Sequence, residues 1–159
     1  MGSFLERSLG LFCAGYQIVY PEGLDNLCCG MAFHSKGFRR TAAEKAAELE
    51  DALMTASDGG RLPILCDTSP CLHHMKNTLD PSLDLYEPIE FTLKYLAERL
   101  TFEKQPGTVA LHTVCSAKKI GLEDKLVTLA RMCASDVLVP EVNCCGFAGD
   151  KGFSVPELN

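Results

Sequence analysis

The tripeptide Cys-Cys-Gly occurs twice in the sequence, at residues 28–30 and 144–146. Two neighbouring cysteines can form a disulfide with each other only through a strained ring, so we do not expect a structural disulfide in either pair. Adjacent thiolates can instead bind an iron-sulfur cluster or a zinc ion, and the glycine lets the backbone approach the sulfurs closely. We therefore interpret both tripeptides as metal-binding turns rather than tight turns with incidental thiols.

The composition predicts one soluble globular domain. The 159 residues are 47% hydrophobic and 23% charged, and no apolar run approaches the length of a membrane span. The first residues lack the basic and apolar regions of a signal peptide, so we do not expect export. A net charge of −6 without an extended lysine or arginine cluster argues against nucleic acid as a partner. Nine cysteines in such a chain indicate metal or redox chemistry rather than a disulfide framework.

The two tripeptides lie within longer segments that resemble each other. Val19-Tyr20-Pro21-Glu22 parallels Leu138-Val139-Pro140-Glu141, and Lys36-Gly37-Phe38 parallels Lys151-Gly152-Phe153. Such a match on both sides of a motif predicts an internal duplication. We expect a single cysteine-rich domain over residues 1–159, pseudo-duplicated as about 1–80 and 107–159.

Four short runs rich in β-branched, aromatic or aliphatic residues predict strands. They are residues 16–20, 62–66, 108–114 and 136–139, and Pro-Glu follows the first and last. The runs at 62–66 and 108–114 are apolar enough for buried strands.

Helices are predicted in the intervals between the strands. A capping box at Thr41 and Glu44 opens one that should end at Gly59-Gly60, Pro88 opens a second, and a third covers residues 122–133. The second helix has a predicted apolar stripe of Ile89, Leu93, Leu96, Ala97 and Leu100. Strands separated by helices pair in parallel, so the predicted fold class is α/β, with two similar lobes of short parallel sheets flanked by helices.

Two further cysteines lie where ligands collect in open α/β folds, at the carboxyl ends of strands. Cys71 follows the strand at 62–66 and Cys115 ends the strand at 108–114. Each is next to the start of a predicted helix, where the positive end of the helix dipole favours a thiolate. Both are candidate metal ligands.

The other cysteines and the histidines are interpreted as structural. Cys66 lies within an apolar strand, and Cys13 and Cys133 lie on apolar helix faces, so these three are assigned to the core. His73 and His74 are adjacent and would point about 100° apart on a helix, which disfavours a shared metal. All four histidines are assigned packing or solvated roles.

Six segments together resemble a known family. They are Leu27-Cys28-Cys29-Gly30-Met31, Ser35-Lys36-Gly37-Phe38, Asp67-Thr68-Ser69-Pro70-Cys71, Pro88-Ile89-Glu90-Phe91, Cys115-Ser116-Ala117-Lys118-Lys119 and Cys144-Cys145-Gly146-Phe147-Ala148-Gly149-Asp150. They are similar to segments of the cysteine-rich, or CCG, domains found in duplicate in heterodisulfide reductase B subunits, glycolate oxidase iron-sulfur subunits and iron-sulfur lactate dehydrogenases. The chain most resembles the C-terminal part of the FAD-linked iron-sulfur D-lactate dehydrogenases.

Carried over residue by residue, the resemblance implies two sets of metal ligands. Cys28, Cys29 and Cys71 form one set, and Cys115, Cys144 and Cys145 form the other. A four-iron cluster normally takes about four protein thiolates, so each set is one short. We therefore expect the chain to be a fragment of a larger enzyme that loads iron incompletely, with zinc as the other metal such thiols bind.

The resemblance implies an electron-transfer module of a flavin-dependent D-lactate, or related 2-hydroxyacid, dehydrogenase. FAD on another domain would remove the hydride, and this chain would pass electrons on to a quinone or cytochrome acceptor without catalytic residues of its own. The implied partners are the FAD and ferredoxin-like domains of the parent enzyme, in the cytoplasm or peripherally at the cytoplasmic face of the inner membrane. Two alternatives stay open, a structural zinc module and a metal-free interaction domain.

Overall fold

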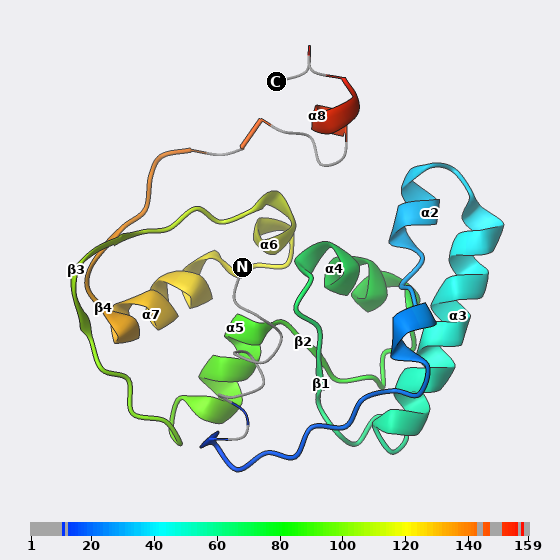
Figure 1. The fold of residues 1–159 in the computed structure, drawn as a ribbon, viewed down its shortest axis with the longest axis horizontal. Helices are drawn as coiled ribbons and strands as arrows, with labels where there is room; N and C mark the ends of the chain where they lie inside the picture. The colour runs from blue at the N-terminus through cyan, green and yellow to red at the C-terminus, as the bar shows by residue number, and fades with distance from the viewer. Residues whose placement is uncertain (1–10, 12, 143–144, 147–150, 156, 158–159) are drawn as a thin grey trace. The chain divides into compact units, whose positions relative to one another are not determined.

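The chain divides into two compact units, Met1–Thr101 and Phe102–Asn159. The computed structural model describes residues 11, 13–142, 145–146, 151–155 and 157. Each unit contains a two-stranded parallel sheet together with helices (Figure 1). The α/β class and the parallel pairing of the strands are therefore confirmed, whereas the internal duplication stays a prediction.

Within the described residues, the first unit has an extended segment at 16–21 and continues through alternating helices and short strands (Figure 1). In chain order its elements are the short helix η1 (Leu24–Asn26), α2 (Met31–Ser35), α3 (Arg39–Ala56), β1 (Ile64–Leu65), α4 (Ser69–Thr78), β2 (Leu85–Tyr86), α5 (Pro88–Phe91) and the π-helical turn η2 (Thr92–Leu96). Strand β1 pairs with β2, with Ile64 opposite Leu85.

Helix α3 is the longest of these elements, and the residues on one of its faces are buried. Its residues Ala42, Ala46, Leu49 and Leu53 recur at helical spacing and are all buried. The predicted capping box is wrong, because the helix begins at Arg39 and no side chain caps it. Its first backbone bond runs from the Ala42 N–H to the Phe38 carbonyl at 2.9 Å, so Thr41 is already inside the first turn.

Two of the strand predictions in this unit need correction. Residues 16–20 form no strand, and Val19 and Tyr20 are 56% and 47% exposed. A short run requires a neighbouring strand to complete its hydrogen bonds, and Pro21 ends this one before it meets a partner. The predicted strand at 62–66 is reduced to Ile64–Leu65, and its partner β2 was not predicted.

Helix α5 starts as predicted and then widens. Pro88 is its first residue, and the Glu87 carboxylate accepts a hydrogen bond from the Ile89 N–H at 2.7 Å. The following turn, Thr92–Leu96, is π-helical, and the two buried side chains here are Phe91 and Leu96. The predicted stripe, which assumed α-helical spacing throughout, included Leu96 but missed Phe91.

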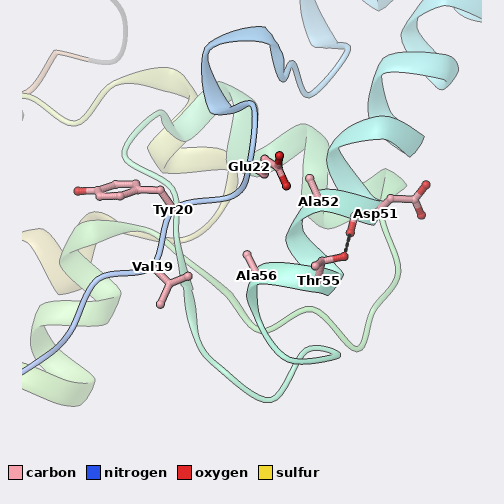
Figure 2. A pocket seen from close by; sticks show the side chains of 7 residues that line it. All are labelled: Val19, Tyr20, Glu22, Asp51, Ala52, Thr55 and Ala56. Atoms are coloured by element: carbon pink, nitrogen blue, oxygen red, sulfur yellow. Dashed lines mark hydrogen bonds between the residues drawn. The ribbon is translucent and has the colours of Figure 1, made fainter.

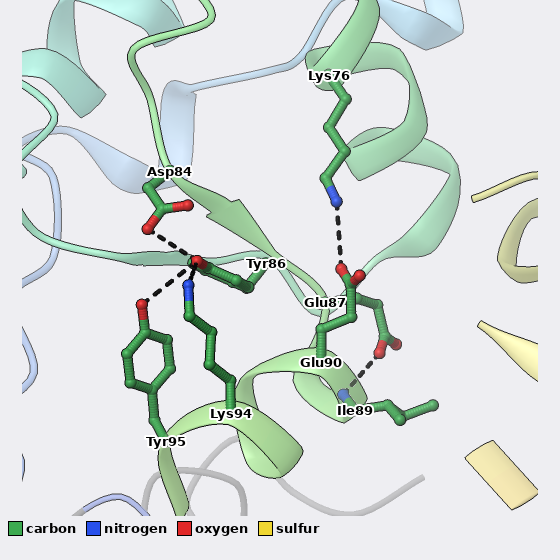
Figure 3. A network of polar contacts seen from close by, with 8 residues as sticks. All are labelled: Lys76, Asp84, Tyr86, Glu87, Ile89, Glu90, Lys94 and Tyr95. Atoms are coloured by element: carbon green, nitrogen blue, oxygen red, sulfur yellow. Dashed lines mark hydrogen bonds and ion pairs between the residues drawn. The ribbon is translucent and has the colours of Figure 1, made fainter. Parts of the chain in front are cut away.

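A polar network ties β2 to this widened helix (Figure 3). The Tyr86 hydroxyl on β2 donates to the Asp84 carboxylate at 2.9 Å and accepts from the Tyr95 hydroxyl at 3.3 Å. The Lys94 ammonium also donates to the Tyr86 hydroxyl and lies 4.5 Å from the centroid of its ring. Hydrogen bonding and the cation–π contact therefore hold the π-helical turn against the end of the sheet.

The second unit has a sheet of strands β3 (Gln105–Ala110) and β4 (Ala134–Leu138), which pair in parallel. Its helices are α6 (Cys115–Lys119), α7 (Glu123–Cys133) and α8 (Lys151–Ser154). Helix α7 confirms the prediction over 122–133, and β4 confirms the strand near 136–139. The prediction of a buried strand over 108–114 is wrong in its end point and in its burial, since β3 stops at Ala110 and all its residues are exposed. A sheet of two strands in so small a unit leaves its faces open.

Among the described residues, one leucine in each unit is completely buried, Leu72 on α4 and Leu122 before α7. A side chain with no exposed surface contributes fully to the hydrophobic stabilisation of its unit. In the part of the chain that the structure describes, no helix has the length and apolar character needed to cross a membrane.

Replacing Leu72 by alanine should therefore destabilise the first unit. We expect Leu72→Ala to lower the free energy of unfolding by about 2–5 kcal/mol, because the substitution removes buried methyl groups and leaves a cavity. Leu62→Ala is the matched control, since Leu62 is 46% exposed. Chemical denaturation measures the free energy of unfolding of both variants, and equal decreases would contradict the complete burial of Leu72.

Candidate metal centre

The first Cys-Cys-Gly turn is held against the start of α3 by its glycine. Gly30 has the left-handed backbone angles φ 84° and ψ −12° and precedes α2. A Cβ atom at this position would lie 2.3 Å from the Ala42 carbonyl oxygen of α3. Only glycine satisfies both the positive φ and the close approach, so the turn requires this residue. The Gly30 N–H also donates to the Cys28 Sγ at 3.4 Å, which orients that sulfur.

The structure brings the sulfurs of Cys29 and Cys71 into contact. The Cys71 thiol donates a hydrogen bond to the Cys29 sulfur, and the backbone N–H of Met31 and the thiol of Cys28 also donate to it. These hydrogen bonds, led by that from Cys71, lower the pKa of Cys29 from 9.0 to about 6, although its burial acts in the opposite direction. The same hydrogen bond, followed by burial and the neighbouring thiols, raises the pKa of Cys71.

Cys71 reaches this position because the chain turns directly from a strand into a helix. Strand β1 ends at Leu65, and α4 begins at Ser69 with Pro70 in its first turn. Cys71 is the third residue of α4, where backbone N–H groups have no acceptor within the helix. The predicted placement of Cys71 at a helix start after a strand is confirmed.

Cys66 lies near these thiols, although its apolar strand led the sequence analysis to assign it to the core. Its side chain is only partly buried, its Sγ lies 3.7 Å from the Thr68 carbonyl oxygen, and it interacts electrostatically with both Cys29 and Cys71. Burial is the main reason that the pKa of Cys66 is raised, with the negative charge of Asp67 adding to it. The assignment to the core rested on its apolar strand. Its position at the end of that strand could have indicated a candidate ligand, because the strand-end rule used for Cys71 applies equally to Cys66.

The first unit therefore places four thiols near one another: Cys28 and Cys29 in the Cys-Cys-Gly turn, Cys66 after β1 and Cys71 in α4. Thiols are the usual ligands of iron-sulfur clusters and of structural zinc. Among the described residues, however, no three His, Cys, Asp or Glu side chains converge around a single ion position.

The second predicted ligand set is described only in part. Cys115 is exposed at the first residue of α6, as the predicted helix start requires, and Cys145 is exposed. Cys144 lies outside the described residues. The convergence of these three cysteines thus stays a prediction. Two cysteines assigned to the core also need correction, since Cys13 is exposed and Cys133 is only partly buried.

A separate open cavity of about 440 Å³ lies between the extended segment and α3 (Figure 2). Val19, Tyr20 and Glu22 line it from the segment, and Ala52 and Ala56 line it from α3. No cysteine of the described chain lines this cavity, so it is distinct from the thiol cluster.

The chain is similar to a component of a known dehydrogenase. It is 25% identical over 165 residues to the C subunit of the anaerobic glycerol-3-phosphate dehydrogenase of Escherichia coli strain K12, and equally to that of Escherichia coli O157:H7. The alignment covers 96% of this chain but 41% of each relative, so the chain spans less than half the length of these proteins. No family model matches the chain, and no solved structure matches it significantly.

Substituting Gly30 tests how the first turn is held. Gly30→Ala should destabilise the first unit by more than Gly37→Ala, because both glycines have positive φ but only Gly30 would place its Cβ against backbone. Thermal unfolding gives the melting temperature of each variant. The loss in Gly37→Ala reports the cost of the positive φ alone, and any additional loss in Gly30→Ala reports the clash with Ala42. Equal shifts in melting temperature would show that the close approach is unimportant.

Removing the donor from Cys71 should raise the pKa of Cys29 in the metal-free protein. With Cys71→Ala, Cys29 loses its strongest hydrogen bond, so its pKa should rise from the value of about 6 in the parent protein toward the ordinary value of a thiol. Cys71→Ser keeps a hydroxyl donor and is the matched control with a smaller rise. Carbon NMR of the Cys29 Cβ across a pH series gives the pKa, and an unchanged value in Cys71→Ala would refute the contact.

Proposed function

We propose that this chain is an iron-sulfur electron-transfer module of a flavin-dependent dehydrogenase. The observation that carries the proposal is that Cys71 of α4 interacts with Cys29 of the first Cys-Cys-Gly turn, beside Cys28 and with Cys66 nearby. The similarity to the C subunit of a glycerol-3-phosphate dehydrogenase supports an oxidoreductase context. The resemblance of the Cys-Cys-Gly segments to CCG domains supports the iron-sulfur assignment.

The four cysteines of the first unit would hold the cluster, which takes up and passes on single electrons when bound. Around them, the N–H groups of Gly30 and Met31 donate hydrogen bonds to the sulfurs of Cys28 and Cys29. Such hydrogen bonds stabilise negative charge on a thiolate and raise the reduction potential of a centre that it binds. Burial of Cys29, which is 6% exposed, keeps water from its sulfur.

The second unit would hold a further centre in the same proposal. Cys115, Cys144 and Cys145 are its proposed ligands, from the start of α6 and from the second Cys-Cys-Gly segment. No catalytic residue is assigned in either unit, since hydride removal belongs to the FAD domain of the parent enzyme.

The substrate that we propose for the parent enzyme is D-lactate or a related 2-hydroxyacid, on the resemblance of its motifs. The relatives are named for glycerol-3-phosphate instead, and both substrates are oxidised at a secondary alcohol. A quinone or cytochrome would accept the electrons, and the parent would lie in the cytoplasm or peripherally at the cytoplasmic face of the inner membrane. The partners of the module would be the FAD and ferredoxin-like domains.

Anaerobic reconstitution of the chain with iron and sulfide tests the proposal. We expect bound iron and sulfide with broad visible absorption, in about four of each for the first unit if Cys66 supplies the fourth thiolate and in smaller amounts if Cys28, Cys29 and Cys71 act alone. Cys29→Ser and Cys66→Ser should each lose most of this iron, because each removes a ligand. Cys133→Ser is the control, since Cys133 lies in α7 outside both proposed ligand sets, and it should keep the iron of the parent protein.

Other results would replace the proposal. Bound zinc without sulfide would indicate a structural zinc module. A chain that binds neither metal and melts at the same temperature after chelation would indicate a metal-free interaction domain. Iron retained in full by Cys66→Ser would remove Cys66 from the ligand set and leave Cys28, Cys29 and Cys71.

A further inference from the structure

We propose that a groove bounded by α2, α3 and α4 in the first unit binds a small phosphate, either inorganic or as a monoester. The groove has a volume of about 360 Å³, and His34, Arg39 and His74 line it from these three helices. None of the described cysteines lines it, so the inference does not rest on the proposed metal centre.

Three nitrogen-bearing side chains line the groove, and two of them lie close together. The rings of His34 and His74 lie with their centroids 5.3 Å apart. Arg39 follows His34 through a tight turn, in which the Gly37 N–H donates to the His34 carbonyl and the Arg39 N–H to the Gly37 carbonyl, at 3.0 and 2.9 Å. A guanidinium offers up to five N–H donors, and an imidazole offers at least one whether it is charged or neutral.

No carboxylate occupies these donors in the described part of the chain. Arg40 forms an ion pair with Glu44 at 3.3 Å, whereas Arg39 beside it has no ion pair among the described residues. The groove does contain one carboxylate, Glu50, but it lies eleven residues further along α3, about 16 Å from Arg39 by helical rise. Glu50 is also engaged, because it accepts a hydrogen bond from the Asp80 N–H at 2.6 Å.

This arrangement favours an anion over a cation. A metal ion between the two imidazoles would be repelled by the nearby guanidinium, whereas a phosphate can accept hydrogen bonds from all three side chains. The floor of the groove is made of small side chains of α3, Ala42, Ala43, Ala46 and Ala47. It therefore leaves room beside these side chains for the short carbon chain of a phosphate monoester.

Histidine-resolved NMR of the whole chain tests the site. Inorganic phosphate and propyl phosphate are titrated at constant ionic strength, with acetate as the carboxylate probe. We expect saturable shifts of the His34 and His74 ring signals with both phosphates and weaker binding of acetate. Arg39→Gln should weaken phosphate binding by about tenfold or more, through loss of a charge-assisted hydrogen bond. Arg40→Gln is the matched control and should bind like the parent protein.

Three results would overturn the proposal. One is an equal effect of Arg39→Gln and Arg40→Gln, which would indicate general charge attraction. The second is the absence of saturable shifts at His34 and His74. The third is a response of both rings to zinc ions but not to phosphate, which would make the groove a cation site. Circular dichroism of each variant establishes that it is folded before binding is compared.

Discussion

The close approach of Gly30 to the Ala42 carbonyl determines where the first pair of sulfurs lies. With no Cβ in the way, the Cys-Cys-Gly turn rests on the first turn of α3, and this contact holds Cys29 beside the start of α4. The glycine of the motif is thus a packing requirement in this unit as well as a source of an N–H donor. At the second motif, Gly146 also has a positive φ of 75°, but no atom of the described residues would contact a Cβ there.

Features set by local chemistry could be predicted from the sequence. Parallel α/β pairing followed from the alternation of strands and helices, and the start of α5 followed from Pro88. The placement of Cys71 in the first turn of a helix after a strand was also predicted correctly. In each case neighbouring residues in the chain determine the outcome, so a pattern of a few residues is sufficient.

Features that depend on distant segments could not be predicted in this way. Whether residues 16–20 form a strand depends on a partner strand that the sequence does not reveal, and the same holds for the burial of β3. The inclusion of Cys66 in the thiol cluster depends on how β1 and α4 meet the Cys-Cys-Gly turn. Its apolar neighbours indicated the core, and the structure shows a partly exposed sulfur near Cys29. The hydrophobicity of a strand therefore does not predict whether a cysteine at its end lies in the core or near a functional site.

The π-helical turn at Thr92–Leu96 sets which side chains meet at the end of the first unit. Residues five positions apart on an α-helix differ by about 140° in direction, but a π-turn brings them onto one face. Phe91 and Leu96 are such a pair, and with Ala14 they form a small hydrophobic cluster. If one residue were deleted from this turn, Leu96 would follow Phe91 by four positions, a spacing that the ordinary α-helical pitch also places on one face. The widened turn thus accommodates one extra residue without moving Leu96 off the face that Phe91 occupies.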